Sequence, residues 1–434
     1  MTPSRLPDLD LATATLLLRT PTRGLAIARL VFAHGIVHER QPGAVHVLAE
    51  MLMRGTRRRS YGALLESMDD LALSFDIHVG HATTTLVLSA PEECIDAAVA
   101  LVREVFDDPL IDDAELDRLL SVLDEEASSN LDDTDALASL ALRRALWPAH
   151  RPGLPVEGTP GTRAGLDVPT LRRELEALRS APSLLCVAHD APGAVAAQLS
   201  ALRGGAAARP WQPGALASAP PRQWGRTVVI DVGDLETTQV QLVARAPQPG
   251  DADFDAATLH HELVAGGASG ALFKVLRGKL GLSYTVESSF EPGSDGWAYA
   301  LRLDPETRRL REALAQTARV WREAATVATA TQQQAAVTRL RARRAMDLAS
   351  PEATIGLYGG AAARGEPFAA LEQLPDRVAA LPLDALPPVA ERWGIGHEQP
   401  AMVLVGPAAE LPLPAGAEVL TVSELKARLW AAYP

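Results

Sequence analysis

The first side chains that could do chemistry are His46 and Glu50, in the segment "GAVHVLAEMLMRGT" (residues 43–56). Positions four apart share one face of an α-helix, so the imidazole and the carboxylate would project together. Zinc-dependent hydrolases use this geometry to place two metal ligands on one side of a helix, with a glutamate between them as general base. An ordinary contact between a histidine and a glutamate has the same spacing. The segment is therefore an altered metal site, a lost one, or a helix that binds no metal.

This helix belongs to a repeat that divides the chain into two similar halves. A Pro- and Ala-rich stretch, residues 209–225, has turn-forming residues and no clear period, as expected of a linker. On each side the order of elements is the same: a strand, a helix, two further strands and two further helices. We expect two homologous domains, residues 1–215 and 222–434, joined between about residues 205 and 225.

The repeat is clearest where "LALSFDIHVG" (residues 71–80) matches "LGLSYTVESS" (residues 280–289). Strand alternation predicts that Leu282, Tyr284 and Val286 lie on one face, as Phe75 and its alternate neighbours do in the first half. Strands followed by helices within each repeat indicate an α+β fold. We expect each domain to be an antiparallel sheet with helices covering one face.

The composition excludes several partners. The 434 residues carry a formal net charge of −13, which disfavours nucleic acid and anionic membranes as partners. No apolar run is long enough to span a bilayer, and the N-terminal residues lack the features of a secretory signal, so we expect a cytoplasmic location. Cys94 and Cys186 stand in apolar stretches and are expected to be buried free thiols.

The segment around His46 resembles G-L-A-H-x-x-E-H-M-L-x-x-G-T of the pitrilysin and insulinase peptidases, the M16 family. In the family's inverted motif H-x-x-E-H, both histidines bind zinc and the glutamate is the general base. His46 matches the first histidine, whereas Ala49 stands in place of the base and Glu50 in place of the second histidine. The family's third ligand is a glutamate on a later helix, and "LDEEASSNLDD" places Glu126 there. The resemblance implies that His46, Glu50 and Glu126 are a degenerate remnant, with no metal or other cofactor in this chain.

The resemblance also covers the second half. M16 enzymes close around their substrate, and the half opposite the zinc contributes an arginine and a tyrosine in a segment resembling L-R-E-K-x-G-L-x-Y. The sequence "LRGKLGLSY" places Arg277 and Tyr284 at both positions, with Gly278 where the family often has glutamate. The implied roles are catalytic: a tyrosine hydroxyl stabilises the oxyanion of the tetrahedral intermediate, and a guanidinium holds substrate carbonyls. A core position is the alternative for Tyr284, because Phe75 stands at the matching place.

The segment before this pair, "VAGGASGALFKVL", resembles the family's glycine-rich turn and the helix that follows it. The resemblance implies that Gly266, Gly267 and Ser269 bind substrate. Ser269 is also suited to cap the helix.

A chain that lacks the zinc motif and retains the Arg/Tyr pair resembles the non-catalytic subunit of a heterodimeric M16 metalloendopeptidase. Its partner would carry H-x-x-E-H and the zinc, and the substrate would be an extended small peptide or peptide precursor, engaged by strand addition. Mitochondrial processing peptidase divides the labour in this way. Two alternatives stay open: an M16-like scaffold that binds peptides without a role in hydrolysis, and an atypical metallopeptidase that uses His46, Glu50 and Glu126.

Other polar clusters have simpler interpretations. His260, His261 and Glu262 are adjacent on a helix and point in different directions. We therefore expect some of them to lie on the helix surface and the others in the core. The basic turn "GTRRRS" (residues 55–60) is expected to be solvated.

Overall fold

The structure is a computed structural model that describes residues 7–203, 211–212, 216, 219–293, 295–396 and 400–431. Within the predicted linker (residues 209–225), residues 209–210, 213–215 and 217–218 lie outside these described residues. Residues 1–6 and 432–434, at the two ends of the chain, also lie outside them.

The first half places most of its helices after the first five strands. Its elements are β1 (Asp8–Asp10), β2 (Thr15–Arg19), β3 (Leu25–Phe32), α1 (Ala44–Leu52), α2 (Tyr61–Asp70), β4 (Ser74–Val79), β5 (Thr84–Pro91), α3 (Ile95–Asp107), α4 (Asp113–Ser129), α5 (Thr134–Leu146), α6 (Pro160–Arg163), α7 (Val168–Ser180), β6 (Ser183–His189), α8 (Pro192–Leu199) and the short η3 (Ser200–Arg203).

The second half repeats this order. Its elements are β7 (Thr227–Asp231), β8 (Gln239–Arg245), α9 (Phe254–Ala265), the π-helix η5 (Phe273–Lys279), β9 (Ser283–Gly293), β10 (Gly296–Pro305), α10 (Leu310–Thr326), α11 (Ala330–Asp347), α12 (Pro351–Arg364), α13 (Phe368–Ala379), α14 (Leu386–Arg392), β11 (Ala401–Gly406), β12 (Glu418–Thr421) and α15 (Val422–Leu429).

The two six-stranded sheets share one topology. The strand orders are β1-β2-β6-β3-β5-β4 and β12-β7-β11-β8-β10-β9, so five strands of one sheet correspond one to one with five strands of the other. Each sheet is mixed: β2 pairs in parallel with β6, and β7 in parallel with β11, while the hairpins β4–β5 and β9–β10 are antiparallel. Both hairpins end in an edge strand, β4 or β9. The predicted α+β fold with two similar domains is confirmed, but the sheets are mixed and not purely antiparallel as predicted, because β6 and β11 return to the sheet parallel to β2 and β7.

Local sequence explains where the helices begin. The helices α2, α4, α5 and α7 start after Ser60, Asp112, Asp133 and Asp167, each of which accepts a hydrogen bond from a backbone amide in the first turn. Helix α1 lacks such a side-chain cap and is buried on most of its surface. Packing of its apolar side chains therefore contributes much of its stability.

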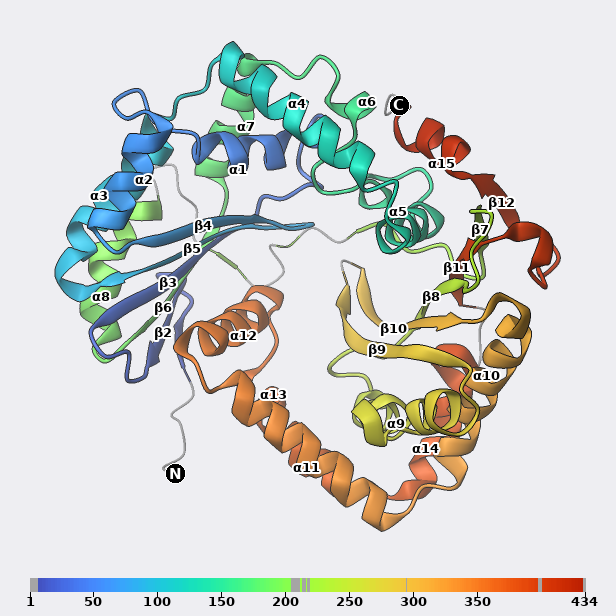
Figure 1. Ribbon diagram of the computed structural model, residues 1–434. Helices are drawn as coiled ribbons and strands as arrows, with labels where there is room; N and C mark the ends of the chain where they lie inside the picture. The colour runs from blue at the N-terminus through green and yellow to red at the C-terminus, as the bar shows by residue number, and fades with distance from the viewer. Residues whose placement is uncertain are drawn as a thin grey trace.

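Each half sends one helix across to the sheet of the other half. Helix α12 packs its Ile355, Tyr358 and Ala362 against the apolar side chains of β2, β3 and β6, and Figure 1 shows it, in orange, beneath the blue strands. Helix α5 packs Leu137 and Ala141 against β7, β8 and β11 of the second sheet. Both faces of each sheet are thereby covered in part. In the part of the chain that the structure describes, we find no helix long and apolar enough to cross a bilayer.

Candidate functional site

A buried carboxylate fixes the start of helix α1. The backbone amides of Gly43 and Val45 each donate to a carboxylate oxygen of Glu39 at 3.0 Å, and Arg151 forms an ion pair with the same group. Burial raises the pKa of Glu39, which Arg151 and the two amides oppose. Because Gly43 has φ of 98° and a Cβ there would lie 2.7 Å from the Glu157 carbonyl oxygen, the entry to α1 requires glycine. The direction of α1, and of the side chains on it, is set by these contacts.

His46 and Glu50 form the one face of α1 that is not in the core. Both side chains are half-buried, whereas the other seven residues of the helix are buried. Val45, Leu48 and Leu52 are in the interior, as the helical period predicts. The two polar side chains thus project together from one fixed face.

Helix α4 packs against α1 and brings its acidic C-terminal half near His46. Burial lowers the pKa of His46, and the carboxylates of Glu50, Glu157 and Glu126 partly oppose this. The Arg163 guanidinium also lowers the pKa of His46. The Arg163 side chain is 2% exposed and donates to Asp124 Oδ1 at 2.6 Å and to the Glu157 carbonyl oxygen at 2.8 Å.

Arg277 and Tyr284 lie against each other in the second half. The guanidinium carbon of Arg277 is 3.9 Å from the centre of the Tyr284 ring and 5.0 Å from that of Phe273. Tyr284 is 74% exposed, so it is not a core aromatic residue. Within the described residues, neither the guanidinium of Arg277 nor the hydroxyl of Tyr284 has a hydrogen-bond or ion-pair partner. Both groups are therefore free to meet a ligand.

A π-helix and a tight turn bring this pair together. Arg277 lies on η5 (Phe273–Lys279), and such wide turns are rare and often occur at functional sites. The chain then reverses at Gly281, which has φ of 55°. Arg309 donates to the carbonyl oxygens of Leu280 at 3.1 Å and Gly281 at 3.4 Å, so the turn is tied to the start of α10.

Tyr284 departs from the predicted alternation. Leu282 is buried and Val286 packs against the core, but Tyr284 is not on their face. The pairing of β9 with β10 explains this, because Val286 pairs with Leu303 while Ser283 pairs with Pro305. Two residues, Tyr284 and Thr285, thus stand opposite one, which is the geometry of a β-bulge. In the first half β4 pairs with β5 without a shift, and Phe75 is buried.

Family comparisons agree with this architecture. Residues 15–159 match the family model described as insulinase (peptidase family M16), and residues 194–339 match the one described as the peptidase M16 inactive domain. The chain belongs to the M16 peptidase family. An uncharacterized zinc protease of Rickettsia felis is 22% identical over 267 residues, which cover 60% of this chain and 63% of that relative. The chain therefore spans less than two thirds of the length of this relative.

Solved M16-like structures share the fold. A peptidase M16 inactive domain from Pseudomonas fluorescens superposes with a TM-score of 0.76 at 18% identity, covering 93% of this chain and 96% of that chain. A protease from Helicobacter pylori superposes with a TM-score of 0.75 at 14% identity, covering 90% of this chain and 96% of that chain.

The residues around His46 do not fit the zinc of an M16 enzyme. Among the residues that the structure describes, no group of three or more histidine, cysteine, aspartate or glutamate side chains is placed to hold a metal ion. Glu126 is exposed, and Ala49 offers no group that could accept a proton from water. The buried guanidinium of Arg163, paired with Asp124, lies within electrostatic reach of His46 and would oppose a divalent cation there, whereas the carboxylates of Glu50, Glu126 and Glu157 would favour one. Arg163 could not be found from the sequence, because its role depends on α6 folding back onto α4 and onto the segment before α1.

The glycine-rich turn of the M16 resemblance is shaped by packing. A Cβ on Gly266 would lie 2.3 Å from the Glu262 carbonyl oxygen and 2.8 Å from Arg339 Nη2, whereas a Cβ on Gly267 would meet nothing within 4 Å. Ser269, expected to cap the next helix, instead donates from its hydroxyl to the Gly266 carbonyl oxygen at 3.4 Å. Binding of substrate by these residues stays a prediction.

His260, His261 and Glu262 are all buried, so no part of this cluster is helix surface. Glu262 is paired with Arg339 Nε at 3.2 Å and Arg343 Nη1 at 2.8 Å, both from α11. Two arginines from a helix distant in the sequence thus compensate the charge of the buried Glu262 carboxylate. The residues next to Glu262 in the sequence do not predict this burial.

The basic turn after α1 is neutralised locally. Arg59 forms an ion pair with Glu104, and Arg57 lies 3.4 Å from the carboxylate of Asp108. Of the two cysteines, Cys186 is buried as predicted, while Cys94 is half-buried.

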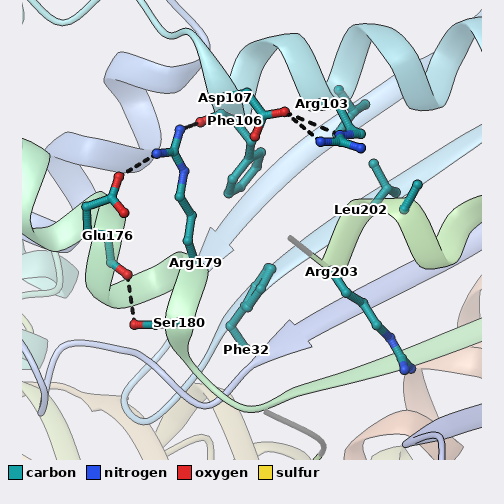
Figure 2. A pocket seen from close by; sticks show the side chains of 11 residues that line it. Phe32, Arg103, Phe106, Asp107, Glu176, Arg179, Ser180, Leu202 and Arg203 are labelled. Carbon is teal, nitrogen blue, oxygen red and sulfur yellow. Dashed lines mark hydrogen bonds and ion pairs between the residues drawn. The ribbon is translucent and has the colours of Figure 1, made fainter. Parts of the chain in front are cut away.

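A separate cavity of about 200 Å³ lies on the outer side of the first sheet (Figure 2). Phe32 and Phe106 face it from β3 and α3, and Arg179 and Arg103 stand at its rim. Arg179 donates to Glu176 Oε1 at 2.5 Å, and Arg103 donates to Asp107 Oδ2 at 3.0 Å. Its lining shares no residue with α1, η5 or β9, so it is not part of the candidate site.

Proposed function

We propose that this chain is the non-catalytic subunit of a heterodimeric M16 zinc peptidase that processes small peptides or peptide precursors. The observation that carries the proposal is the pair of half-buried Arg277 and exposed Tyr284, whose polar groups have no hydrogen-bond or ion-pair partner among the described residues. The zinc motif of the same chain has Ala49 and Glu50 at two decisive positions. The pair would act in trans, opposite the zinc of the partner subunit.

The chemistry assigned to the pair follows from its two polar groups. Attack on a peptide carbonyl places negative charge on the carbonyl oxygen, and the Tyr284 hydroxyl can donate a hydrogen bond to that oxygen. The guanidinium of Arg277 presents several N–H donors in a planar fork and can donate to the peptide carbonyls on either side of the scissile bond. The zinc of the partner subunit, with its H-x-x-E-H glutamate, would supply the activated water.

An extended peptide has places to bind. Strands β4 and β9 are sheet edges, so their outer backbone groups can accept an added strand. A cavity of about 790 Å³ adjoins the tip of the β9–β10 hairpin and is lined from both halves, by His81 on one side and by Phe254, Trp297 and Leu374 on the other. Its volume falls within the range of small-ligand pockets and suits a few peptide side chains.

The location that we propose is the cytoplasm. Cys94 and Cys186 are both free, which suits a reducing compartment.

The test is reconstitution with an H-x-x-E-H protein encoded near this chain. We expect a 1:1 complex by light scattering and cleavage of the cognate peptide only when both chains are present. If the partner cleaves the peptide at the same rate with and without this chain, this chain is a scaffold with no role in hydrolysis. Chelator-sensitive cleavage by this chain alone would instead identify an atypical metallopeptidase.

A further inference from the structure

Asp304 is the one residue of β10 that stands opposite the bulge carrying Tyr284. On β10 it lies between Leu303 and Pro305, whose partners on β9 are Val286 and Ser283. We propose that Asp304 is a positioning residue: it anchors the bulge and thereby holds the Tyr284 hydroxyl at the place where it acts. The effect of Asp304 on catalysis rests on the proposed function. The anchoring of the bulge by Asp304 rests on the geometry alone.

The carboxylate of Asp304 binds both neighbours of Tyr284. Its Oδ1 accepts from the Ser283 hydroxyl at 2.7 Å and from the Thr285 amide at 2.7 Å. Its Oδ2 accepts from the Thr285 hydroxyl at 2.7 Å. The Asp304 amide in turn donates to the Ser283 hydroxyl oxygen at 2.8 Å. Tyr284 is therefore held between two residues that are each bonded to one carboxylate.

These bonds satisfy backbone and side-chain groups that the bulge would otherwise leave unpaired. An extra residue in one strand interrupts the ladder, and the freed amide needs another acceptor. Hydrogen bonds to an ionised carboxylate are stronger than bonds between neutral groups. Asp304 therefore stabilises the bulge from the opposite strand.

The first half provides the contrast. Its hairpin has Ala90 at the place that matches Asp304 in the repeat, and Ala90 is buried without a side-chain acceptor. There β4 and β5 stay in register from Ser74 opposite Ser89 onward, and Phe75 points into the core. The acceptor, the bulge and the exposed aromatic ring occur together in one half and are absent together from the other.

The anchor is tested by hydrogen–deuterium exchange on the isolated chain. Asp304→Ala removes every acceptor, and we expect the Thr285 amide to lose protection by at least about tenfold. Asp304→Asn keeps an oxygen that can accept from the same amide, and we expect it to restore most of the protection. Amides of β9 from Ser288 to Glu291 serve as the internal control. Equal exchange at Thr285 in Asp304→Ala and in the unchanged chain would overturn the anchor.

Cleavage by the reconstituted complex tests the positioning role. We expect Asp304→Ala to lower kcat by about tenfold to 10²-fold, with little change in KM or partner affinity, because misplacing one catalytic group costs this much. In a Tyr284→Phe background the same change should have almost no further effect, since the hydroxyl that it positions is gone. If the kcat losses of Asp304→Ala and Tyr284→Phe are fully additive, or if Asp304→Ala weakens partner binding, Asp304 has a general structural role and the positioning role is overturned.

Thr285→Val is a second, milder variant that keeps side-chain shape and removes only the bond to Oδ2. It should lower kcat in the same direction by less, and an unchanged kcat together with unchanged local exchange would count against the anchor. If Tyr284→Phe itself leaves kcat unchanged in an intact complex, the proposed function fails, while the exchange experiment still decides the anchor.

Discussion

The Arg277 guanidinium carbon lies 3.9 Å from the centre of the Tyr284 ring, although Tyr284 is 74% exposed. A cation over an aromatic face at this distance is attracted by the ring, by about 0.5–1 kcal/mol at exposed sites. The contact restrains two side chains that solvent would otherwise leave mobile. Arg54 and Tyr61 form a looser pair of the same kind in the first half, with 5.8 Å between the guanidinium carbon and the ring centre, and provide a matched control.

Tyr284→Phe should lower kcat of the reconstituted complex by ~10²–10³, because it removes one donor to the oxyanion and keeps the ring. Steady-state cleavage of the cognate peptide measures this, with partner binding checked in parallel. Tyr61→Phe, at a tyrosine that is 50% exposed, should leave kcat unchanged. An unaltered kcat in Tyr284→Phe would show that the hydroxyl does no chemistry.

Arg277→Ala should mainly lower kcat/KM, since a guanidinium that binds substrate carbonyls contributes to positioning. The change also removes packing, because the side chain contacts the rings of Phe273 and Tyr284. Arg54→Ala is the control and should leave kcat/KM as it was. A loss of the same size in both variants would point to surface charge in general.

The isolated chain should hold much less than one zinc per molecule and should not cleave peptides. The reason lies in the side chains around His46. Ala49 has no group that could act as a general base, and the buried Arg163 carries a positive charge within reach of His46. Elemental analysis after dialysis, together with a peptide assay with and without chelator, measures both. Stoichiometric zinc with chelator-sensitive cleavage would contradict the subunit proposal.

Gly266→Ala should destabilise the fold more than Gly267→Ala. The new Cβ at Gly266 would press on the Glu262 carbonyl oxygen and on Arg339, and such overpacking costs about 1–3 kcal/mol or more. At Gly267, where φ is 73° and space is open, only the backbone conformation opposes a side chain, by roughly 1–2 kcal/mol. Urea unfolding compares the two, with Gly193→Ala, in open space on α8, as the control that should not lose stability. A stable Gly267→Ala that lowers cleavage would support substrate binding at this turn.

Acid should destabilise the fold, in part because two histidines of the second half are buried in a neutral state. Burial lowers the pKa of both His260 and His261 from 6.5 to about 4, with a further contribution from His261 to the first and from Arg343 to the second. The unfolded chain takes up these protons first, so stability is constant above about pH 7 and falls as pH drops from 6.5 towards 4. Each group contributes on the order of 3 kcal/mol to that fall.

His260→Gln should flatten this pH dependence, because glutamine can donate to the Trp321 carbonyl oxygen that His260 contacts at 2.8 Å and takes up no proton. Urea titrations at pH 7, 6 and 5 measure the slope. His78→Gln, at an exposed position on β4, should not alter it. An unchanged slope in His260→Gln would place the acid sensitivity elsewhere.

The sequence predicted what short-range periodicity controls. The buried stripe of Val45, Leu48 and Leu52 and the matching order of strands and helices follow from local patterns, and the structure has both. The spacing of Arg277 and Tyr284 across a glycine turn predicted that the two could converge, and they are in contact.

Other features depend on contacts that the local pattern does not contain. Alternation assumes an unbroken strand, so it placed Tyr284 with Leu282, and one extra residue on β9 overturned that. The burial of Glu262 depends on arginines of α11, 77 and 81 positions further along the chain. Parallel pairing of β2 with β6 joins segments separated by most of the first half, and no turn between them specifies it.

The crossing of α5 and α12 bears on how the protein can be divided. A cut within residues 209–225 would leave the first sheet without the helix that covers Leu16 and Ile27, and the second without the helix that covers Val228 and Val403. Each fragment would then expose an apolar face together with a free amphipathic helix that fits the other fragment. Two such polypeptides, made separately and mixed, should complement each other and restore the native assembly, whereas either one alone should aggregate.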